Sequence, residues 1–264
     1  MSVSFQYIDG EGGTYSLATA THRKLMGFGG VGMVAPEHFW QDLPDRDGSE
    51  HLGHRMPRRT MNFVVKQAAS TRGSAWTQKR DIAEAFSLDK GRGRIKATLP
   101  DGTVREIYAR YTGGLDFSTE DSETPWIQDF PIQVVCEESH WRSSTVSSAS
   151  ANFNGAASVG ITCNVEGDVP TYPTIRVGAA VEHPVLTLGG GTIDIDANIA
   201  AGTLEIDCSE PTVTMGATNY MGSATAASEF WELARGGNSV SITATSGSGL
   251  CKISWTDKWE ALRP

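Results

Sequence analysis

The stretch SEFWELARGGNSVSITATSGSGLCKISWTDKW, residues 228–259, decides the fold class. Its aromatic start is followed by Gly236-Gly237-Asn238, a combination that breaks regular structure. Apolar side chains then alternate with polar ones on both sides of a Gly-Ser turn, and alternation at period two is typical of strands with one buried face. The alternating residues are Val240, Ile242, Ala244, Cys251, Ile253 and Trp255. The stretch therefore predicts a hairpin that closes a β-sandwich.

The rest of the second half agrees with an all-β domain. Short apolar runs recur between turns at the spacing expected of a sandwich. The predicted strands cover residues 159–165, 174–177, 185–188, 192–195, 202–208 and 212–215. With 29 glycines and 39% hydrophobic residues in 264, the composition indicates a globular protein rich in turns and excludes disorder.

The first half mixes strands with one helix. Residues 3–7 alternate as a first strand, and residues 74–86 repeat apolar side chains at helical spacing, with Trp76, Ile82 and Phe86 on the predicted inner face. The following residues predict a hairpin, because Pro100-Asp101-Gly102 separates two alternating runs. Residues 22–59, rich in Gly, Pro, Asp and His, are interpreted as one long loop.

A domain boundary is predicted near the middle of the chain. The strand expected at residues 130–137 ends the first half, and residues 144–157 are rich in Ser, Ala and Asn, as linkers often are. This gives domains at residues 1–143 and 158–264. The expected fold class is mainly β, with one main helix.

Charge is unevenly divided between the two halves. Residues 1–143 hold 17 Lys and Arg against 19 Asp and Glu, a net charge of −2, and residues 144–264 hold 5 against 12, a net charge of −7. Nucleic-acid binding is driven by clustered cationic side chains that displace counterions. The sequence therefore predicts no stable nucleic-acid binding.

The cellular location and the redox state of the cysteines are also predicted from the sequence. The first residues lack the basic start and apolar stretch of a secretory signal, and no apolar run is long enough to span a membrane, so synthesis in a host cytoplasm and no membrane partner are expected. Cys136, Cys163, Cys208 and Cys251 are widely spaced in strand-like segments. They are interpreted as buried, reduced thiols.

No motif in the chain predicts a cofactor, metal or catalytic site. Residues 27–32, GFGGVG, satisfy G-x-G-x-x-G, but a polar loop is expected after them in place of the helix that would hold a pyrophosphate. A polar cluster whose spacing matches neither a twelve-residue calcium loop nor H-E-x-x-H is interpreted as a solvated loop, although oxygen and nitrogen ligands for a divalent cation gather there. It comprises Asp42, Asp45, Asp47, Glu50, His51 and His54. Residues 237–241 lack the last glycine of a nucleophile elbow.

Several motifs, in order, resemble the distal tail proteins of long-tailed siphophages. The first half carries GVGM at residues 30–33, PDGTVREIYARY at residues 100–111 and QVVCEESHW at residues 133–141. The second half carries GDVPTYPTIRVG at residues 167–178 and AGTLEID at residues 201–207, before the closing stretch. Glu138-Ser139 stands where family members often have Asp-Pro, so the local corner geometry departs from the family.

The resemblance implies a structural protein of the phage tail rather than an enzyme. It implies an N-terminal, β-barrel-like belt domain that forms a hexameric ring and a C-terminal galectin-like β-sandwich. The ring would join the tail tube protein to the baseplate hub or tail-tip protein, with receptor-binding and tape measure proteins as further partners in the virion. Phe28, Val31, Met33, Phe39 and Trp40 are the predicted subunit-interface residues. No catalytic, cofactor-binding or metal-binding residue is implied.

Carbohydrate binding is the alternative function. Galectin-like folds invite it, and sugar sites need an exposed aromatic ring beside hydrogen-bonding side chains. Trp231, Trp255 and Trp259 are the candidates, but two of them lie in strand or corner positions that favour core packing. A tail-tip hydrolase ranks third, because the sequence has no nucleophile or metal motif.

We expect negligible affinity for DNA at physiological salt, because the acidic second half repels phosphate. A fluorescence anisotropy titration with duplex DNA checks this expectation. Tight binding that weakens steeply with added salt would contradict it.

Overall fold

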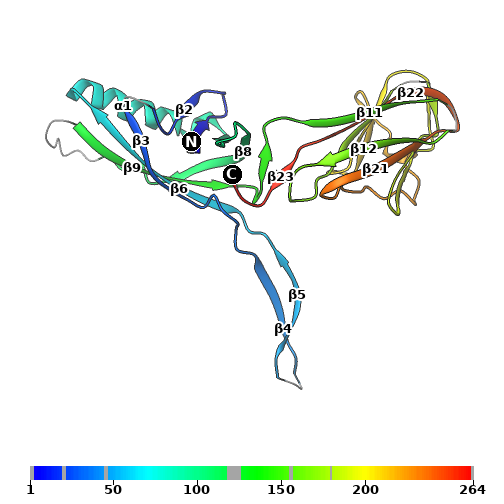
Figure 1. Cartoon of the computed structure of the whole chain (residues 1–264), viewed down its shortest axis with the longest axis horizontal. Coiled ribbons are helices and arrows are strands. Elements are labelled where there is room, and N and C mark those ends of the chain that lie inside the picture. Colours follow the sequence, from blue (N-terminus) through cyan, green and yellow to red (C-terminus); the bar gives the residue numbers. More distant parts are fainter. Residues whose placement is uncertain are drawn as a thin grey trace. The chain divides into compact units, whose positions relative to one another are not determined.

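The computed structural model describes residues 3–19, 22–44, 47–117, 126–154, 157–178 and 180–262 (Figure 1). The fold is mainly β with one long helix, as the sequence predicts. Two compact units share the chain: the first comprises Met1–Ser144 together with Glu260–Pro264, and the second comprises Thr145–Trp259. The last residues of the chain thus belong to the first unit, whereas the sequence placed them in the second domain.

The first unit is built on one antiparallel sheet with the strand order β2-β1-β7-β8-β9-β6-β3, and β10 pairs with β8 at its side. The strands are β1 (Ser4–Ile8), β2 (Thr14–Ser16), β3 (Arg23–Gly29), β6 (Arg59–Ala69), β7 (Gly93–Thr98), β8 (Val104–Gly113), β9 (Trp126–Cys136) and β10 (Trp141–Ser143). In the described part of the chain the end strands β2 and β3 do not pair with each other. The sheet is therefore open and does not form a closed barrel.

The core of this unit follows from alternation and from the helix. Met61, Phe63 and Val65 on β6 are buried, while the residues between them face outward. Helix α1 (Arg72–Ala85) begins at Thr71, whose side chain and Ser74 form a capping box. Ile82 is fully buried on this helix.

The predicted inner face of the helix is confirmed at Ile82 and Phe86 but not at Trp76. Phe86, directly after α1, stacks on Tyr7 with ring centroids 4.3 Å apart, as the helical spacing predicts. Trp76, predicted to face inward as well, is 53% exposed. The helical spacing was correct for Ile82 and Phe86, but it could not show that Trp76 lies on the surface. The short helix η1 (Leu88–Lys90) follows.

The predicted long loop at residues 22–59 is wrong. It contains β3 and a second pair of strands, β4 (Glu37–Asp42) and β5 (Ser49–Arg55), which form a separate two-stranded sheet. Nearly all side chains of β4 and β5 are exposed, so the sequence has no apolar-polar alternation there. These strands are defined by backbone pairing alone, so the sequence contains no pattern of buried residues from which they could be predicted.

The second unit is a β-sandwich of two sheets around one core. One sheet has the order β17-β14-β22-β13-β18-β19-β20, with β11 also paired to β22, and the other has the order β12-β21-β15-β16. The strands are β11 (Ser147–Asn154), β12 (Val159–Val165), β13 (Thr174–Gly178), β14 (Val181–Glu182), β15 (Val185–Leu188), β16 (Gly191–Asp194), β17 (Asn198–Ile199), β18 (Thr203–Asp207), β19 (Thr212–Met215), β20 (Thr218–Asn219), β21 (Gly236–Thr243) and β22 (Ser246–Trp255). The short strand β23 (Lys258–Trp259) belongs to neither of these two sheets. The short helix η2 (Met221–Ser223) follows β20.

The stretch that decides the fold class closes the sandwich, but not as a hairpin. β21 pairs with β12 and β15, whereas β22 pairs with β11, β13 and β14 in the other sheet. Residues 244–245 therefore cross from one sheet to the other. Both strands point alternate side chains into the same core, among them Ile242 and Ile253. Hairpins and such crossings share period two, so alternation cannot distinguish them.

The predicted linker at residues 144–157 is wrong in most of its length. Residues 147–154 form β11, which pairs along its whole length with β22. Ala149 and Ala151 pack against the core, and Phe153 is buried in it. This strand was missed because its small and polar residues give it the composition of a linker. The alternation of Ala149, Ala151 and Phe153 was the signal for a strand.

The Gly-Gly-Asn corner is held by the side chain of Asn238, which is buried. Its Oδ1 accepts from the backbone N–H of Ala234 at 2.9 Å, and its Nδ2 donates to the carbonyls of Ala234 and Gly236 at 2.7 and 3.0 Å. Gly236 has φ 87°, in the left-handed region that glycine tolerates best. One amide side chain thus shapes the entry into β21.

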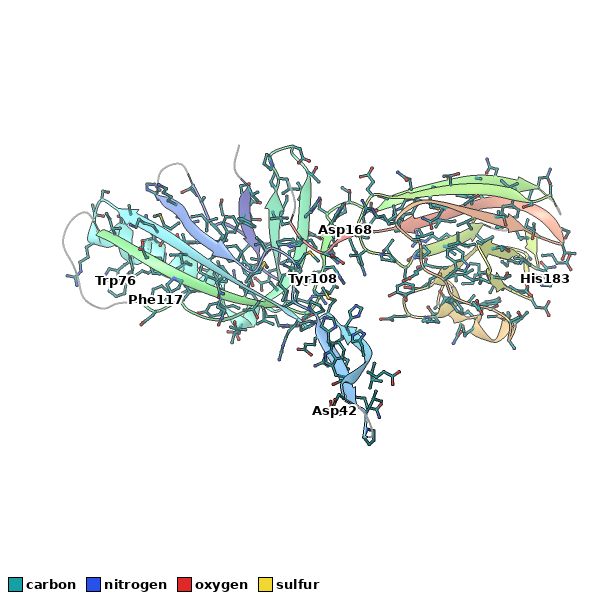
Figure 2. All side chains as sticks on the ribbon, turned by 60° about the horizontal axis from the view of Figure 1, so that its bottom comes forward. Asp42, Trp76, Tyr108, Phe117, Asp168 and His183 are labelled. Carbon is teal, nitrogen blue, oxygen red and sulfur yellow. The ribbon has the colours of Figure 1, made fainter. Side chains whose placement is uncertain are left out.

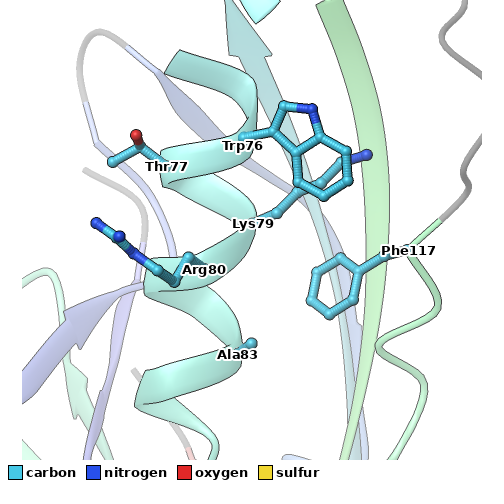
Figure 3. Close-up of a pocket in the computed structure, with 6 residues that line it drawn as sticks. All are labelled: Trp76, Thr77, Lys79, Arg80, Ala83 and Phe117. Atoms are coloured by element: carbon cyan, nitrogen blue, oxygen red, sulfur yellow. The ribbon is translucent and has the colours of Figure 1, made fainter. Parts of the chain in front are cut away.

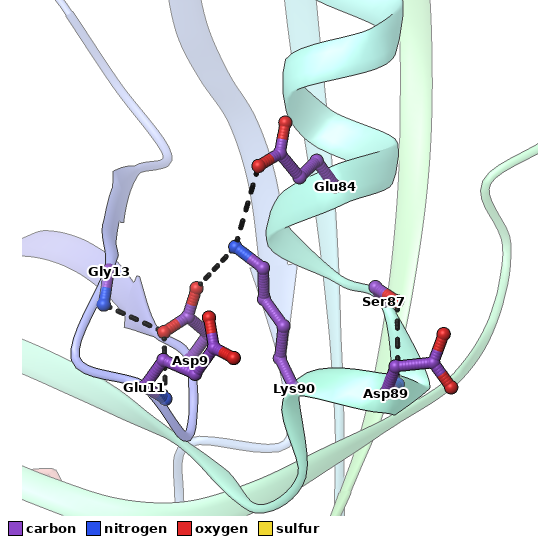
Figure 4. A network of polar contacts seen from close by, with 7 residues as sticks. All are labelled: Asp9, Glu11, Gly13, Glu84, Ser87, Asp89 and Lys90. Carbon is purple, nitrogen blue, oxygen red and sulfur yellow. Dashed lines mark hydrogen bonds and ion pairs between the residues drawn. The ribbon is translucent and has the colours of Figure 1, made fainter.

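A buried carboxylate fixes the turn between β1 and β2 in the first unit (Figure 4). Asp9 accepts from the backbone N–H groups of Gly13 and Glu11 at 2.7 and 3.1 Å, and from Lys90 Nζ at 2.9 Å. Burial alone raises the pKa of Asp9, but the hydrogen bonds from Lys90 and the two backbone groups outweigh it, so that the pKa lies below its ordinary value.

We expect the free energy of unfolding to depend on Asp9 at low pH. Because its folded-state pKa is depressed, its contribution is present above the unfolded pKa of about 3.9 and is lost as the pH falls through the folded value. Asp9→Asn should lower the free energy of unfolding at neutral pH by about 1–3 kcal/mol and flatten this acid dependence. Urea titrations at several pH values measure both, and Asp89→Asn on the exposed η1 is the matched control. Equal stability of the two variants would contradict the account.

Candidate assembly surface

The five predicted interface residues fall on two neighbouring segments of the first unit. Phe28 lies on β3 and is 49% exposed, and Met33, in the segment after it, is 61% exposed. Phe39 and Trp40 lie on β4, with 47% and 60% of their surfaces exposed. Val31 differs, because it is partly buried and its carbonyl accepts from Trp141 Nε1 and from the backbone N–H of Leu262.

The hairpin of β4 and β5, residues 37–55, is here called the arm. In the described residues its strands pair only with each other, and Figure 2 labels Asp42 near its tip. Cross-strand pairing places Phe39 and the ion pair between Glu37 and Arg55, 2.7 Å apart, on one face. The other face carries His38, Trp40, His51 and His54.

The arm exposes more apolar surface than an isolated hairpin can support. Phe39 and Trp40 on β4 and Leu52 on the facing part of β5 are each about half exposed or more. A two-stranded hairpin without a packed face is marginally stable in water. Large exposed apolar side chains on such an element indicate a surface that another molecule covers.

The base of the arm is held by Arg59, which is only 1% exposed. Its Nη1 donates to the carbonyls of Gly30, at 2.7 Å, and Gly32. Its Nη2 donates to the carbonyls of Ser139 and Glu260, each at 2.7 Å. Burial lowers the pKa of Arg59, but a guanidinium stays charged at neutral pH, so these carbonyls supply the solvation that water would otherwise give.

Gly30 must be glycine for this arrangement. Its φ is 77°, and a Cβ there would lie 2.0 Å from the carbonyl oxygen of Thr60. The glycine-rich segment therefore serves close backbone approach to β6. Strand β4, not a helix, follows it, so the G-x-G-x-x-G pattern forms no dinucleotide site.

Among the described strands β3 pairs only with β6, apart from a single bridge between Arg23 and Thr19, and β3 borders a cleft of about 710 Å³ between β1 and β3. Its walls include the apolar side chains of Phe5, Met26 and Phe28. The charged side chains that line it are basic, among them Arg23, Lys24 and Lys66. An unpaired strand edge beside an apolar cleft is a surface that accepts an additional strand.

A second cleft lies along helix α1 (Figure 3), with a volume of about 460 Å³. Trp76 and Ala83 on the helix and Phe117 after β8 form its apolar wall, and Lys79 and Arg80 add positive charge. Phe117 also packs edge-on against the buried Phe130, with ring centroids 5.7 Å apart. The exposed Trp76 thus belongs to a groove and not to the core.

The tryptophans considered for sugar binding are largely buried. Trp231 is 9% exposed and Trp255 is 5% exposed, and both belong to the core of the sandwich. Trp259 is partly buried. Core packing is confirmed for the first two, so they offer no ring for stacking on a sugar.

All four cysteines are free and buried, as predicted. Burial raises the pKa of Cys136, Cys208 and Cys251 to about 12 and that of Cys163 to about 11. A thiol with such a pKa is not a nucleophile at neutral pH. Within the described ranges, no helix is both long and apolar enough to cross a membrane.

Three other aspartates singled out in the sequence have structural partners. Asp42 accepts from Ser49 Oγ at 2.9 Å, and Asp194 bonds His183 Nε2 at 2.6 Å. Asp207 accepts from the backbone N–H of Ser209 in a turn. Asp45 lies outside the described residues. Sequence reasoning missed Arg59, whose only signal was a basic residue in a strand that otherwise alternates apolar and polar side chains.

Comparison with known proteins identifies the second unit. Residues 166–259 match the family of the siphovirus-type tail component, C-terminal domain. No curated protein matches the sequence of the chain.

Solved structures match the fold over nearly the whole length. The crystal structure of SPP1 Dit, from phages that infect Gram-positive bacteria, has a TM-score of 0.71 at 14% identity, covering 96% of this chain and 98% of that one. A chain of the phage P2 baseplate in its activated conformation with Ca has a TM-score of 0.55 at 8% identity, covering 99% and 100%. At such identities the likeness concerns the fold. Together with the family match it confirms the resemblance to siphophage distal tail proteins.

We expect Arg59→Met to destabilise the first unit by about 3 kcal/mol or more, because it leaves several buried carbonyls without donors. Arg59→Lys should cost less, since an ammonium keeps the charge but cannot bridge four acceptors. Guanidinium chloride titrations of the purified protein measure the differences.

Arg58→Met is the matched control for Arg59, because Arg58 is exposed beside it on the chain. We expect this variant to change the free energy of unfolding by less than about 0.5 kcal/mol. A loss of the same size in both variants would show that the buried contacts of Arg59 are not the cause.

Proposed function

We propose, from the premise that the chain belongs to the siphophage distal tail proteins, that six copies form a ring which joins the tail tube to the baseplate. The arm carries this proposal. It is a hairpin of exposed apolar side chains, Trp40 and Leu52 foremost, on a unit whose core is complete without it. Such an element is explained by burial against a neighbouring molecule.

A second copy is the neighbour that the surface favours. The arm and the cleft beside β3 are different features of one unit, so contact between them would be heterologous, and heterologous contacts close into rings when the rotation fits. The cleft is lined by basic side chains, while the end of the arm carries Asp42, Asp47 and Glu50. Opposite charge steers and orients such a contact.

The remaining assignments follow from the same premise. The two faces of the ring would meet the tail tube protein and the baseplate hub, with receptor-binding and tape measure proteins nearby in the virion. The role is structural rather than catalytic, and the chain is made in the host cytoplasm. The acidic second half keeps the ring from holding nucleic acid.

We expect the purified protein to form sixfold rings in negative-stain electron micrographs. Trp40→Ala should shift the protein from rings to smaller species, because a large buried aromatic at an interface contributes about 2 kcal/mol or more per contact. Light scattering after size exclusion gives the mass of each species.

Leu88→Ala is the control, since Leu88 is 74% exposed on η1 of the same unit. It should leave the rings intact. A wild-type protein that stays monomeric at every concentration and is absent from tail particles would overturn the proposal, as would rings that Trp40→Ala leaves unchanged in number.

A further inference from the structure

Three of the six histidines of the chain share one face of the arm. His38 and His54 lie directly opposite each other on β4 and β5, and His51 lies opposite Trp40, two residues from His38 along the sheet face. The register shifts between Phe39 and Trp40, so that Leu52 is the extra residue of a bulge. The bulge brings His51 and His54 onto the same face.

The contacts within this face are close. His38 Nδ1 and His51 Nε2 are 3.0 Å apart, and their ring centroids are 5.1 Å apart. The ring of His54 lies 5.9 Å from that of His38 and 6.4 Å from that of His51. Trp40 covers one side of His51, with ring centroids 4.8 Å apart. All four side chains are exposed, so their rings are free to rotate.

We propose that this face binds a divalent transition-metal cation of the Zn²⁺ class, with His38 and His51 as its first two ligands. Imidazole nitrogens bind Zn²⁺ at about 2.0–2.1 Å, so two ligands of one ion lie about 3 Å apart, as these two nitrogens do. In the free arm one nitrogen donates a proton to the other. On metal binding, that proton moves to the other nitrogen of the same imidazole ring. Both facing nitrogens then each have a lone pair free to coordinate the ion.

His54 is the third ligand and is placed by rotation on binding. In the described residues no three His, Cys, Asp or Glu side chains already stand together as a metal centre. The histidine pair is therefore the preformed part, and His54 and water complete the coordination sphere. Buried thiols with raised pKa values do not compete, because metal binding requires the thiolate.

The consequence is mechanical. The ion would join β4 to β5 at the bulge, where the ladder of backbone hydrogen bonds is interrupted. A cross-link at that point stiffens a hairpin that is otherwise marginally stable. This inference does not depend on ring formation, since every ligand comes from one chain.

The test is a titration of the full-length protein with Zn²⁺ by calorimetry, and with Cu²⁺ by electron paramagnetic resonance, which counts nitrogen ligands. We expect one ion per chain and two or three nitrogen ligands. His38→Ala and His51→Ala should each weaken Zn²⁺ binding about tenfold or more. His54→Ala should weaken it less and remove one nitrogen from the spectrum.

His22→Ala and His183→Ala are the controls, because these histidines lie outside the arm and should leave affinity unchanged. Circular dichroism confirms that every variant is folded. The absence of saturable binding up to millimolar metal would overturn the proposal. Binding that persists unchanged in His38→Ala and His51→Ala would overturn it too, by placing the ion elsewhere.

Discussion

The first unit depends on one buried guanidinium. Arg59 donates hydrogen bonds to carbonyls of residues that are 29, 80 and 201 positions away in sequence, and it is almost fully buried. A charge in that position is tolerable only while each acceptor stays in place. The glycine segment before the arm, the end of β9 and the returning chain end are therefore fixed by one side chain. An arm that must reach a partner needs such a rigid base.

The two units differ in how many large apolar side chains they expose. The second unit is a sandwich with one core, which includes three cysteines and two tryptophans. Among the described residues, its exposed large apolar residues, Val146, Tyr172, Met221 and Leu250, are fewer than those of the first unit. The first unit leaves apolar side chains outside on β3, on the arm and on α1. Large exposed apolar patches often mark interaction sites. We infer that assembly contacts concentrate in the first unit.

The sequence predicted the elements whose buried apolar side chains recur every two residues, as in a strand, or every 3.6 residues, as in a helix. The strands at residues 159–165 and 212–215 were located to the residue, because their inward side chains are apolar. The arm was missed because neither of its faces is buried, and β11 because Ala and Ser conceal its alternation. The hairpin read at residues 240–255 was a crossing between sheets. The pairing partner of a strand depends on residues that are distant in sequence, so the local spacing of apolar residues does not reveal it.

For the candidate surface, too, the sequence indicated only part of what the structure shows. Exposure of Phe28, Met33, Phe39 and Trp40 agrees with their predicted role, while Val31 is held inside its own unit. The central claim is that a partner covers the arm in the tail, and hydrogen exchange of residues 37–55 tests it most directly. We predict that their amides exchange quickly in the dissociated chain and are strongly protected in tail particles. Equally fast exchange in both states would contradict the claim.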